Sequence, residues 1–199
     1  MVYIVGIGPG SREYVLPKAV EIMEKSDIIV GFERAIKSIK FISTDKVNVK
    51  TLKDILNIIN KDSKKNIAVV ASGDPCYYGI TNYIKNNYVG DIDIIPGISS
   101  FQYMMCRLKK TWNTAFTGSM HGREEDFICE VKRNKLSIWL TDKTNSPSEL
   151  CKRLVEENIK AVVYVGENLS YEDEKITCGQ ADEMIDKEYS ELCVVVIEK

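Results

Sequence analysis

The chain has 199 residues, 44% of them hydrophobic, which allows one large domain or two small ones, each with its own core. Its 27 basic and 29 acidic side chains nearly cancel, which argues against nucleic-acid binding, because that usually needs a basic excess. No apolar run approaches the roughly 20 residues that span a membrane. The sequence opens directly on a strand pattern at Val2, so we expect a cytoplasmic protein without a signal peptide or membrane association.

The sequence contains six cysteines and one histidine. No pair of cysteines has the C-x-x-C spacing that is typical of zinc sites. We therefore expect no metal site, and we interpret most of the cysteines as small buried side chains in a reducing compartment.

Short apolar runs alternate with helical patterns over the first half of the chain, which predicts an α/β fold. The predicted strands span residues 2–5, 28–30, 47–49, 67–70 and 91–95. The predicted helices span residues 15–25, 52–59, 80–87 and 99 or 100 to 108.

A polar stretch at residues 109–113 predicts a domain boundary, so that residues 1–110 form one α/β domain and residues 111–199 a second, mixed one. The second domain's predicted strands span residues 115–117, 136–140, 161–165 and 192–197. Its predicted helices span residues 124–133 and 148–158.

The most informative segment is the loop 71–79, which follows the buried strand 67–70 and precedes a helix. Open α/β sheets bind ligands at such carboxyl ends of strands. Gly73 allows close approach of the backbone, and Asp74 is held extended by the following proline, so its carboxylate can accept a hydrogen bond from a ligand. Tyr77 and Tyr78 can cover a flat or partly cationic ligand. The alternative is an ordinary Gly-Asp-Pro turn.

Three other strand ends carry loops that could face a ligand. The glycine-rich loop 6–11 suits close approach, but Ser11 replaces the third glycine of the dinucleotide fingerprint and Pro9 lacks an N–H, so a simple tight turn is an equal alternative. Ser99 or Ser100 can cap a helix while its neighbour binds a ligand. Residues 32–34 form either a third ligand-facing loop or a charged helix start.

Taken together, these motifs resemble the tetrapyrrole methylases, the S-adenosylmethionine-dependent enzymes of corrin and sirohaem synthesis. The family-wide motifs are the loop 6–10, the stretch 72–75 with Tyr78 and Gly79, and the segment 96–100. In the second half, the segments 120–123, 140–142, 145–147 and 166–169, the last followed by Glu174, resemble one branch of the family. That branch methylates C-5 of cobalt-precorrin-7 in cobalamin synthesis.

The resemblance implies a C-methyltransferase of two α/β domains with a cofactor cleft between them, and usually a homodimer. It implies that S-adenosylmethionine contacts first-domain residues, namely Pro9, Gly73, Asp74, Tyr77, Ser99 and Ser100. The matching second-domain residues are Leu140, Thr141, Glu167 and Asn168. The chain lacks the decarboxylase and C-15 methylase domain fused to some relatives, so a separate protein is expected to supply that activity.

The implied substrate is a large tetrapyrrole ring fringed with carboxylates, which basic side chains on loops could bind. We favour His121 and Arg123 for this role, whereas Arg12 and Arg34 are equally well explained as surface charge. No residue is assigned as catalytic, because methyl transfer to carbon mainly requires alignment of the nucleophile with the methyl donor.

Four alternatives remain open at this stage. A nicotinamide-dependent oxidoreductase would need a glycine at Ser11 and an acidic residue closing the second strand, where Glu33 comes late. A non-catalytic binding protein would hold the cofactor without turnover. Within the family, a uroporphyrinogen methylase or a diphthine synthase is the nearest rival.

Overall fold

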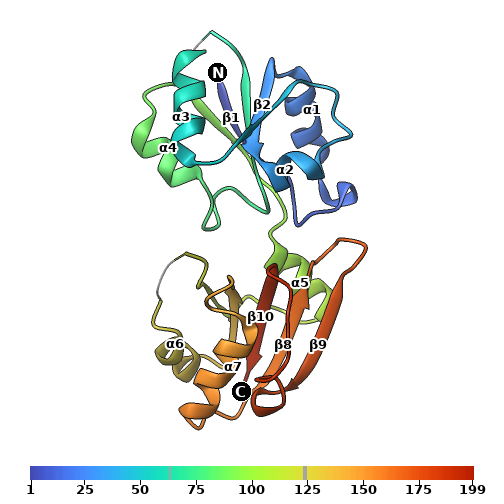
Figure 1. The fold of residues 1–199 in the computed structure, drawn as a ribbon, viewed down its shortest axis with the longest axis vertical. Helices are drawn as coiled ribbons and strands as arrows, with labels where there is room; N and C mark the ends of the chain where they lie inside the picture. Colours follow the sequence, from blue (N-terminus) through green and yellow to red (C-terminus); the bar gives the residue numbers. More distant parts are fainter. Residues whose placement is uncertain (63, 123–124) are drawn as a thin grey trace. The chain divides into compact units, whose positions relative to one another are not determined.

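The computed structural model describes residues 1–62, 64–122 and 125–199. The chain divides into two compact units, Met1–Ser99 and Ser100–Lys199, each built on one five-stranded sheet (Figure 1). This confirms the predicted α/β class with two sheets. The division falls earlier than the boundary after residue 110 that the sequence suggests, because the helix α5 (Ser100–Leu108) packs against strands of the second sheet.

The first sheet is entirely parallel, with the order β3-β2-β4-β1-β5. Its strands are β1 (Val2–Gly6), β2 (Ile28–Phe32), β3 (Lys46–Val49), β4 (Ile67–Ala71) and β5 (Ile92–Ile95). Its helices are η1 (Arg12–Tyr14), α1 (Pro17–Lys25), α2 (Glu33–Ser38), α3 (Leu52–Lys61) and α4 (Thr81–Asn87).

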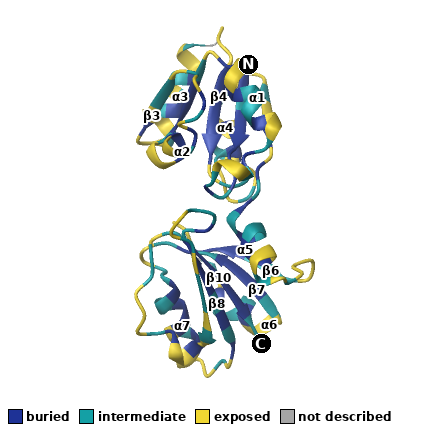
Figure 2. Cartoon of the chain, turned by 90° about the vertical axis from the view of Figure 1, so that its right-hand side faces the viewer, coloured by how far each residue is buried: buried dark blue, intermediate teal, exposed yellow. Residues whose placement is uncertain are grey.

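Successive side chains of the central strands point to opposite faces of the sheet, which divides the first unit's core into two layers. Ala68 and Val70 of β4 pack in one cluster with buried residues of α1 and α2. Ile67 and Val69 pack in another cluster with buried residues of α3 and α4. All five residues of β4 are buried, which is typical of a parallel strand covered on both faces (Figure 2).

The second sheet is mixed, with the order β6-β7-β10-β8-β9, and only its β6–β7 pair is parallel. Its strands are β6 (Phe116–Ser119), β7 (Leu136–Leu140), β8 (Val162–Glu167), β9 (Lys175–Gln180) and β10 (Cys193–Glu198). The other elements are α6 (Phe127–Arg133), α7 (Pro147–Glu156) and η2 (Ala181–Glu183).

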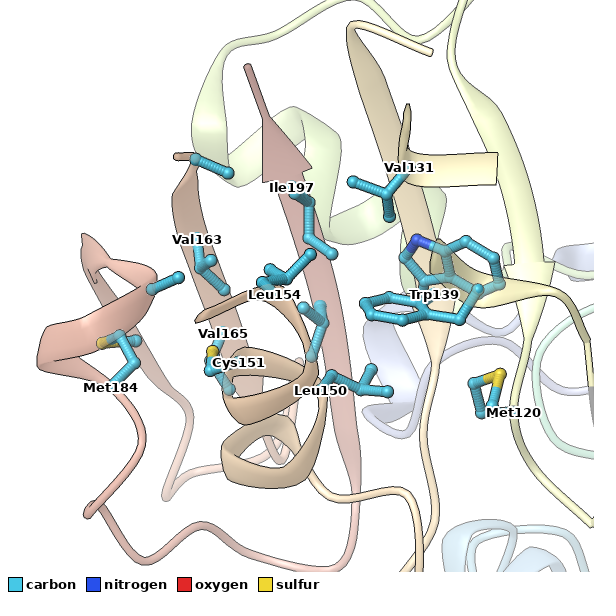
Figure 3. Close-up of a cluster of buried hydrophobic side chains, with 14 of the residues drawn as sticks. Met120, Val131, Trp139, Leu150, Cys151, Leu154, Val163, Val165, Met184 and Ile197 are labelled. Carbon is cyan, nitrogen blue, oxygen red and sulfur yellow. The ribbon is translucent and has the colours of Figure 1, made fainter. Parts of the chain in front are cut away.

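The second unit's main core lies between its sheet and the elements α6, α7 and η2. Trp139 is fully buried there (Figure 3). It packs edge-on against Phe127, with ring centroids 5.0 Å apart. Leu150 and Leu154 of α7 are also fully buried and face the strand residues Val163 and Val165 (Figure 3). This apolar core fixes the strand ends, and with them the loops at the sheet's edge.

Candidate active site

Three loops meet at the carboxyl edge of the first sheet, because the strands that precede them are neighbours. β4, β1 and β5 lie side by side and parallel, so residues that follow them emerge at the same edge. From β1 the chain crosses over β4 to reach β2, on one side of the sheet. From β4 it crosses over β1 to reach β5, on the other side. The two connections diverge in opposite directions, which is the arrangement that creates a ligand site in open α/β sheets.

Glycines let these three loops touch backbone to backbone. A Cβ atom on Gly97 would lie 2.1 Å from the carbonyl oxygen of Gly73, and one on Gly6 would lie 2.6 Å from the nitrogen of Gly97. Gly73 also has a φ of 67° and exchanges two hydrogen bonds with Gly8, of 2.7 and 3.3 Å. We call this contact of Gly6, Gly73 and Gly97 the glycine junction. No larger residue fits at Gly6 or Gly97 without moving the backbone, and the positive φ of Gly73 favours glycine there.

Asp74 links two of the same loops through its side chain. Oδ1 accepts a 2.8 Å hydrogen bond from the N–H of Cys76, and Oδ2 accepts a 3.2 Å bond from the N–H of Gly97. The carboxylate is thus engaged with the protein at both oxygens, whereas the sequence suggested a hydrogen bond to a ligand. Each carboxylate oxygen can accept more than one hydrogen bond, so the two roles are compatible.

The rest of the β4 loop closes on itself and presents aromatic surface. The hydroxyl of Thr81 donates to the carbonyl of the buried Pro75 at 2.7 Å. The rings of Tyr77 and Tyr78 meet edge to face, with centroids 4.9 Å apart. Tyr78 is 37% exposed, so part of this aromatic pair is available to a ligand.

The predicted first-domain cofactor residues share this region, with one exception. Pro9, Gly73, Asp74, Tyr77 and Ser99 lie in the three loops, and the Cα of Ser99 is 3.5 Å from the Cβ position of Gly73. Ser100 instead begins α5 and belongs to the second unit.

The two arginines predicted for the first unit lie outside the glycine junction. Arg12 is exposed in η1, with its guanidinium carbon 4.5 Å from the centroid of the Phe41 ring. The loop expected at residues 32–34 is instead a helix start, because α2 begins at Glu33 and places Arg34, which is exposed, in its first turn; a binding role for Arg34 stays a prediction. The alternative, a charged helix start, is confirmed.

The predicted second-unit residues gather along one edge of the second sheet. Leu140 ends β7 and Thr141 follows it, Glu167 ends β8 and Asn168 follows it, and both strand ends flank the start of β10. The Thr141 hydroxyl donates to the carbonyl of Cys193 at 3.0 Å, and Glu167 Oε1 accepts from the N–H of Ser190 at 3.0 Å. Both side chains are at least nine-tenths buried and help to hold the segment that leads into β10.

A second carboxylate, Asp142, joins the loops after β6 and β7. Its Oδ1 accepts from the N–H groups of Asn145 and Thr144, at 2.7 and 2.9 Å, and its Oδ2 accepts from that of Gly122 at 2.8 Å. The bonds from Asn145, Gly122 and Thr144, in decreasing order, together with the nearby charge of His121, hold the pKa of Asp142 below its ordinary value. Partial burial opposes this shift.

Asn145 extends the same network. Its side-chain N–H₂ donates to the carbonyl of Met120 at 3.2 Å, and Arg153 of α7 donates to its oxygen at 3.0 Å. We call the set of Asp142, Asn145 and Arg153 the aspartate network. His121 lies in the loop that this network holds, whereas Arg123 falls outside the described residues.

The sequence interpretation gave no role to Gly97 or to the aspartate network. An Asx residue two positions after a strand, followed by a Ser-Pro helix start, is the local signal of such a turn. The contacts that matter, Asp74 with Gly97 and Asp142 with Gly122, join residues about twenty positions apart and need the fold to be known.

Within residues 1–62, 64–122 and 125–199, no group of three or more His, Cys, Asp or Glu side chains could hold a metal ion. In the same part of the chain, no helix has the length and apolar character needed to cross a membrane.

One unit thus carries loops at the carboxyl edge of a parallel sheet, and the other carries loops at the edge of a mixed sheet, within one α/β chain. The model of the tetrapyrrole (corrin/porphyrin) methylases matches residues 1–185, and the chain belongs to this family. This membership favours methyl transfer over the nicotinamide-dependent alternative.

Individual relatives are similar over the whole chain. A probable cobalt-precorrin-7 C(5)-methyltransferase of Methanocaldococcus jannaschii is 35% identical and aligns with 100% of this chain and 98% of its own. The crystal structure of a precorrin-6Y methylase from Archaeoglobus fulgidus has a TM-score of 0.82 at 25% identity, covering 100% and 97% of the two chains. A uroporphyrin-III C-methyltransferase from Thermus thermophilus, crystallised with S-adenosylhomocysteine, shares the fold at 17% identity, with the same TM-score and coverage.

Proposed function

We propose that this protein is an S-adenosylmethionine-dependent C-methyltransferase that methylates C-5 of cobalt-precorrin-7 in cobalamin synthesis. The observation that carries the proposal is the 35% identity over the full chain to a relative of that name. The second-unit segments that resemble the same branch, including Asp142 and Asn145, are those that build the aspartate network.

The loops around the glycine junction suit the proposed cofactor. Gly73 leaves room for close approach, since the atom nearest its Cβ position is the Cα of Ser99 at 3.5 Å, and the tyrosine pair offers a partly exposed aromatic face that can cover a cationic group. We assign Pro9, Gly73, Asp74, Tyr77 and Ser99 to this ligand. When bound, S-adenosylmethionine supplies an activated methyl group, and the loops fix its orientation.

Other second-unit and boundary residues stay predictions for the same ligand: Ser100, Leu140, Thr141, Glu167 and Asn168. We assign the tetrapyrrole to the loop after β6, through His121 and Arg123, with Arg12 as a further candidate. We also propose that the protein is a homodimer and is located in the cytosol. Light scattering of the purified protein tests the dimer through its molecular mass.

The function is tested by incubating the purified protein and S-adenosylmethionine with a panel of cobalt-precorrins and uroporphyrinogen. The proposal expects one added methyl group on cobalt-precorrin-7, placed at C-5 by NMR of a ¹³C-labelled methyl donor. A control reaction with S-adenosylhomocysteine should give no product. Methylation of uroporphyrinogen alone, methylation at another carbon, or no turnover with any tetrapyrrole would contradict the proposal.

A further inference from the structure

The imidazole of His121 is tied to the protein through one of its two nitrogens. Nδ1 lies 3.3 Å from the carbonyl oxygen of Thr141, the one hydrogen-bond partner of the ring among residues 1–62, 64–122 and 125–199. A carbonyl oxygen can only accept, so this bond requires the hydrogen to be on Nδ1. The neutral ring then keeps its lone pair on Nε2. The residue is exposed, so this basic atom belongs to a side chain that a ligand can reach.

The backbone on both sides of His121 is held by the aspartate network. Gly122 donates its N–H to Asp142, and Met120 accepts from Asn145. The N–H of His121 itself donates to the Ser119 hydroxyl at 3.2 Å. The loop is therefore fixed at three consecutive residues, which fixes the position from which the ring reaches Thr141.

Three charged groups of the described chain surround this loop. Asp142 lies beside His121 on the loop after β7, and Glu125 accepts a hydrogen bond from the N–H of Ser119 at 3.3 Å. Arg153 of α7 reaches the loop through Asn145. Two carboxylates and one guanidinium thus set the electrostatic surroundings of the imidazole.

Methyl transfer to carbon leaves the tetrapyrrole with a proton to lose. The ring carbon supplies the electron pair of the new carbon–carbon bond, and the carbon–sulfur bond breaks with its pair left on sulfur. The positive charge passes to the tetrapyrrole, which becomes neutral again only by releasing one proton to a base. The sequence interpretation left that base unassigned.

We propose that His121 is this base and that Asp142 is the residue that positions it, an inference that rests on the proposed function. Nε2 accepts the proton from the methylated tetrapyrrole, and the imidazolium later returns it to water. Asp142 acts through the backbone of Gly122: it keeps the loop where Nδ1 can donate to Thr141, so that Nε2 stays the basic atom.

The positioning role of Asp142 can be tested without any ligand. His121 is the only histidine, so the imidazole signals of the protein belong to it alone. Long-range ¹H–¹⁵N correlation of the full-length labelled protein, recorded above the titration of the ring, reports which nitrogen carries the hydrogen. We expect the Nδ1–H form in the wild type. In Asp142→Asn one oxygen still accepts from Thr144 and Asn145, but the N–H₂ group cannot accept from Gly122, so we expect a mixture of the two forms.

Asp54→Asn is the matched control, because Asp54 Oδ2 accepts from the N–H of Thr51 in the first unit. The pKa of Asp54 is also lowered, first by a hydrogen bond with the Thr51 side chain and then by the bond from the Thr51 N–H. The spectrum of this variant should equal that of the wild type. Asn145→Ala, which loses the bond to Met120, replaces Asp142→Asn if that variant does not fold. An Nε2–H form in the wild type, or a wild-type spectrum in the network variant, overturns the proposal.

The proton-acceptor half is tested by the pH profile of turnover on the cobalt-precorrin. The wild-type kcat should fall on the acid side with the pKa that NMR measures for His121. His121→Gln should lose this limb and about 100-fold in kcat, while its affinity for S-adenosylmethionine stays unchanged. An unaltered profile in the variant overturns the acceptor role. If the wild type methylates no tetrapyrrole, the proposed function and the acceptor role fail together, whereas the NMR result judges the positioning by itself.

Discussion

Each unit joins its edge loops around an aspartate that follows a strand, but the two junctions are built differently. In the first unit the loops touch through the backbone of three glycines, and Asp74 adds one bond across them, to Gly97. In the second unit the loops after β6 and β7 are joined by side chains, with Asp142 accepting three N–H groups. The first junction depends on the absence of side chains, and the second on a charge.

This difference predicts which changes each junction tolerates. Close backbone packing leaves no room for one added methyl group, whereas a charge-dependent junction responds to pH and to isosteric neutral substitutions.

Gly97→Ala should have the largest effect, because its Cβ would lie 2.1 Å from the backbone oxygen of Gly73. The loops must separate, and misplacing a binding loop by about 1 Å can cost roughly 100-fold in activity. Calorimetric titration should show affinity for S-adenosylmethionine reduced by a similar factor. Gly122→Ala is the control: that glycine has a positive φ but no atom within 4 Å of its Cβ position, so cofactor affinity should be kept. Equal affinities in the two variants would argue against the glycine junction.

Acidification should weaken the second junction. The pKa of Asp142 is lowered in the folded chain, so its stabilising effect is complete above the unfolded value of about 3.9 and is lost as pH falls through the lower, folded value. Urea unfolding of the wild type and Asp142→Asn should therefore show the wild type more stable at neutral pH, with the difference closing in acid. A difference that stays constant with pH contradicts this account of the charge.

The smallest expected effect is on the rate of cysteine labelling, which can be measured in both units of the same protein. Burial raises the pKa values of Cys151 and Cys193 to about 12, so both should resist alkylation in the native protein. Cys76 of the β4 loop and Cys178 of β9 are exposed and should react. Mass spectrometry should show that S-adenosylmethionine slows the labelling of Cys76 and leaves that of Cys178 unchanged. Equal protection of both thiols would argue against cofactor binding at the β4 loop.

The strand and helix pattern of the first unit could be predicted because its parallel strands are continuous apolar runs, as in β4. β9 was missed, because its residues are half-buried or exposed, include Gly179, and lie at the edge of the sheet. The helix predicted from Glu124 begins at Phe127, where Asp126 caps it by accepting from the N–H of Cys129. The pairing of β9 at the sheet edge is a tertiary choice that local propensity does not reveal, whereas the Asp126 cap is a local signal.

Prediction of the candidate site from the sequence has the same limit. The motif around Asp74 indicated a ligand loop from sequence alone, since strand, glycine and proline are local signals. Its contact with Gly97, and the meeting of Gly73 with Gly6, depend on strand order, which no local pattern encodes. β2 passes directly into α2 at Glu33, and no local pattern around Arg34 indicates a change from strand to helix without a loop.

The central claim is that the first junction serves the cofactor and the second does not. Calorimetric titration of S-adenosylmethionine into Asp74→Ala and Asp142→Ala, with a chelator present, tests it most directly. Each variant loses a carboxylate that bonds backbone N–H groups. Asp74→Ala should bind more weakly by about 1–3 kcal/mol, the cost of a lost partner in a partly buried site, while Asp142→Ala binds like the wild type. Equal affinities in the two variants, or binding that is lost with the chelator, would contradict the account.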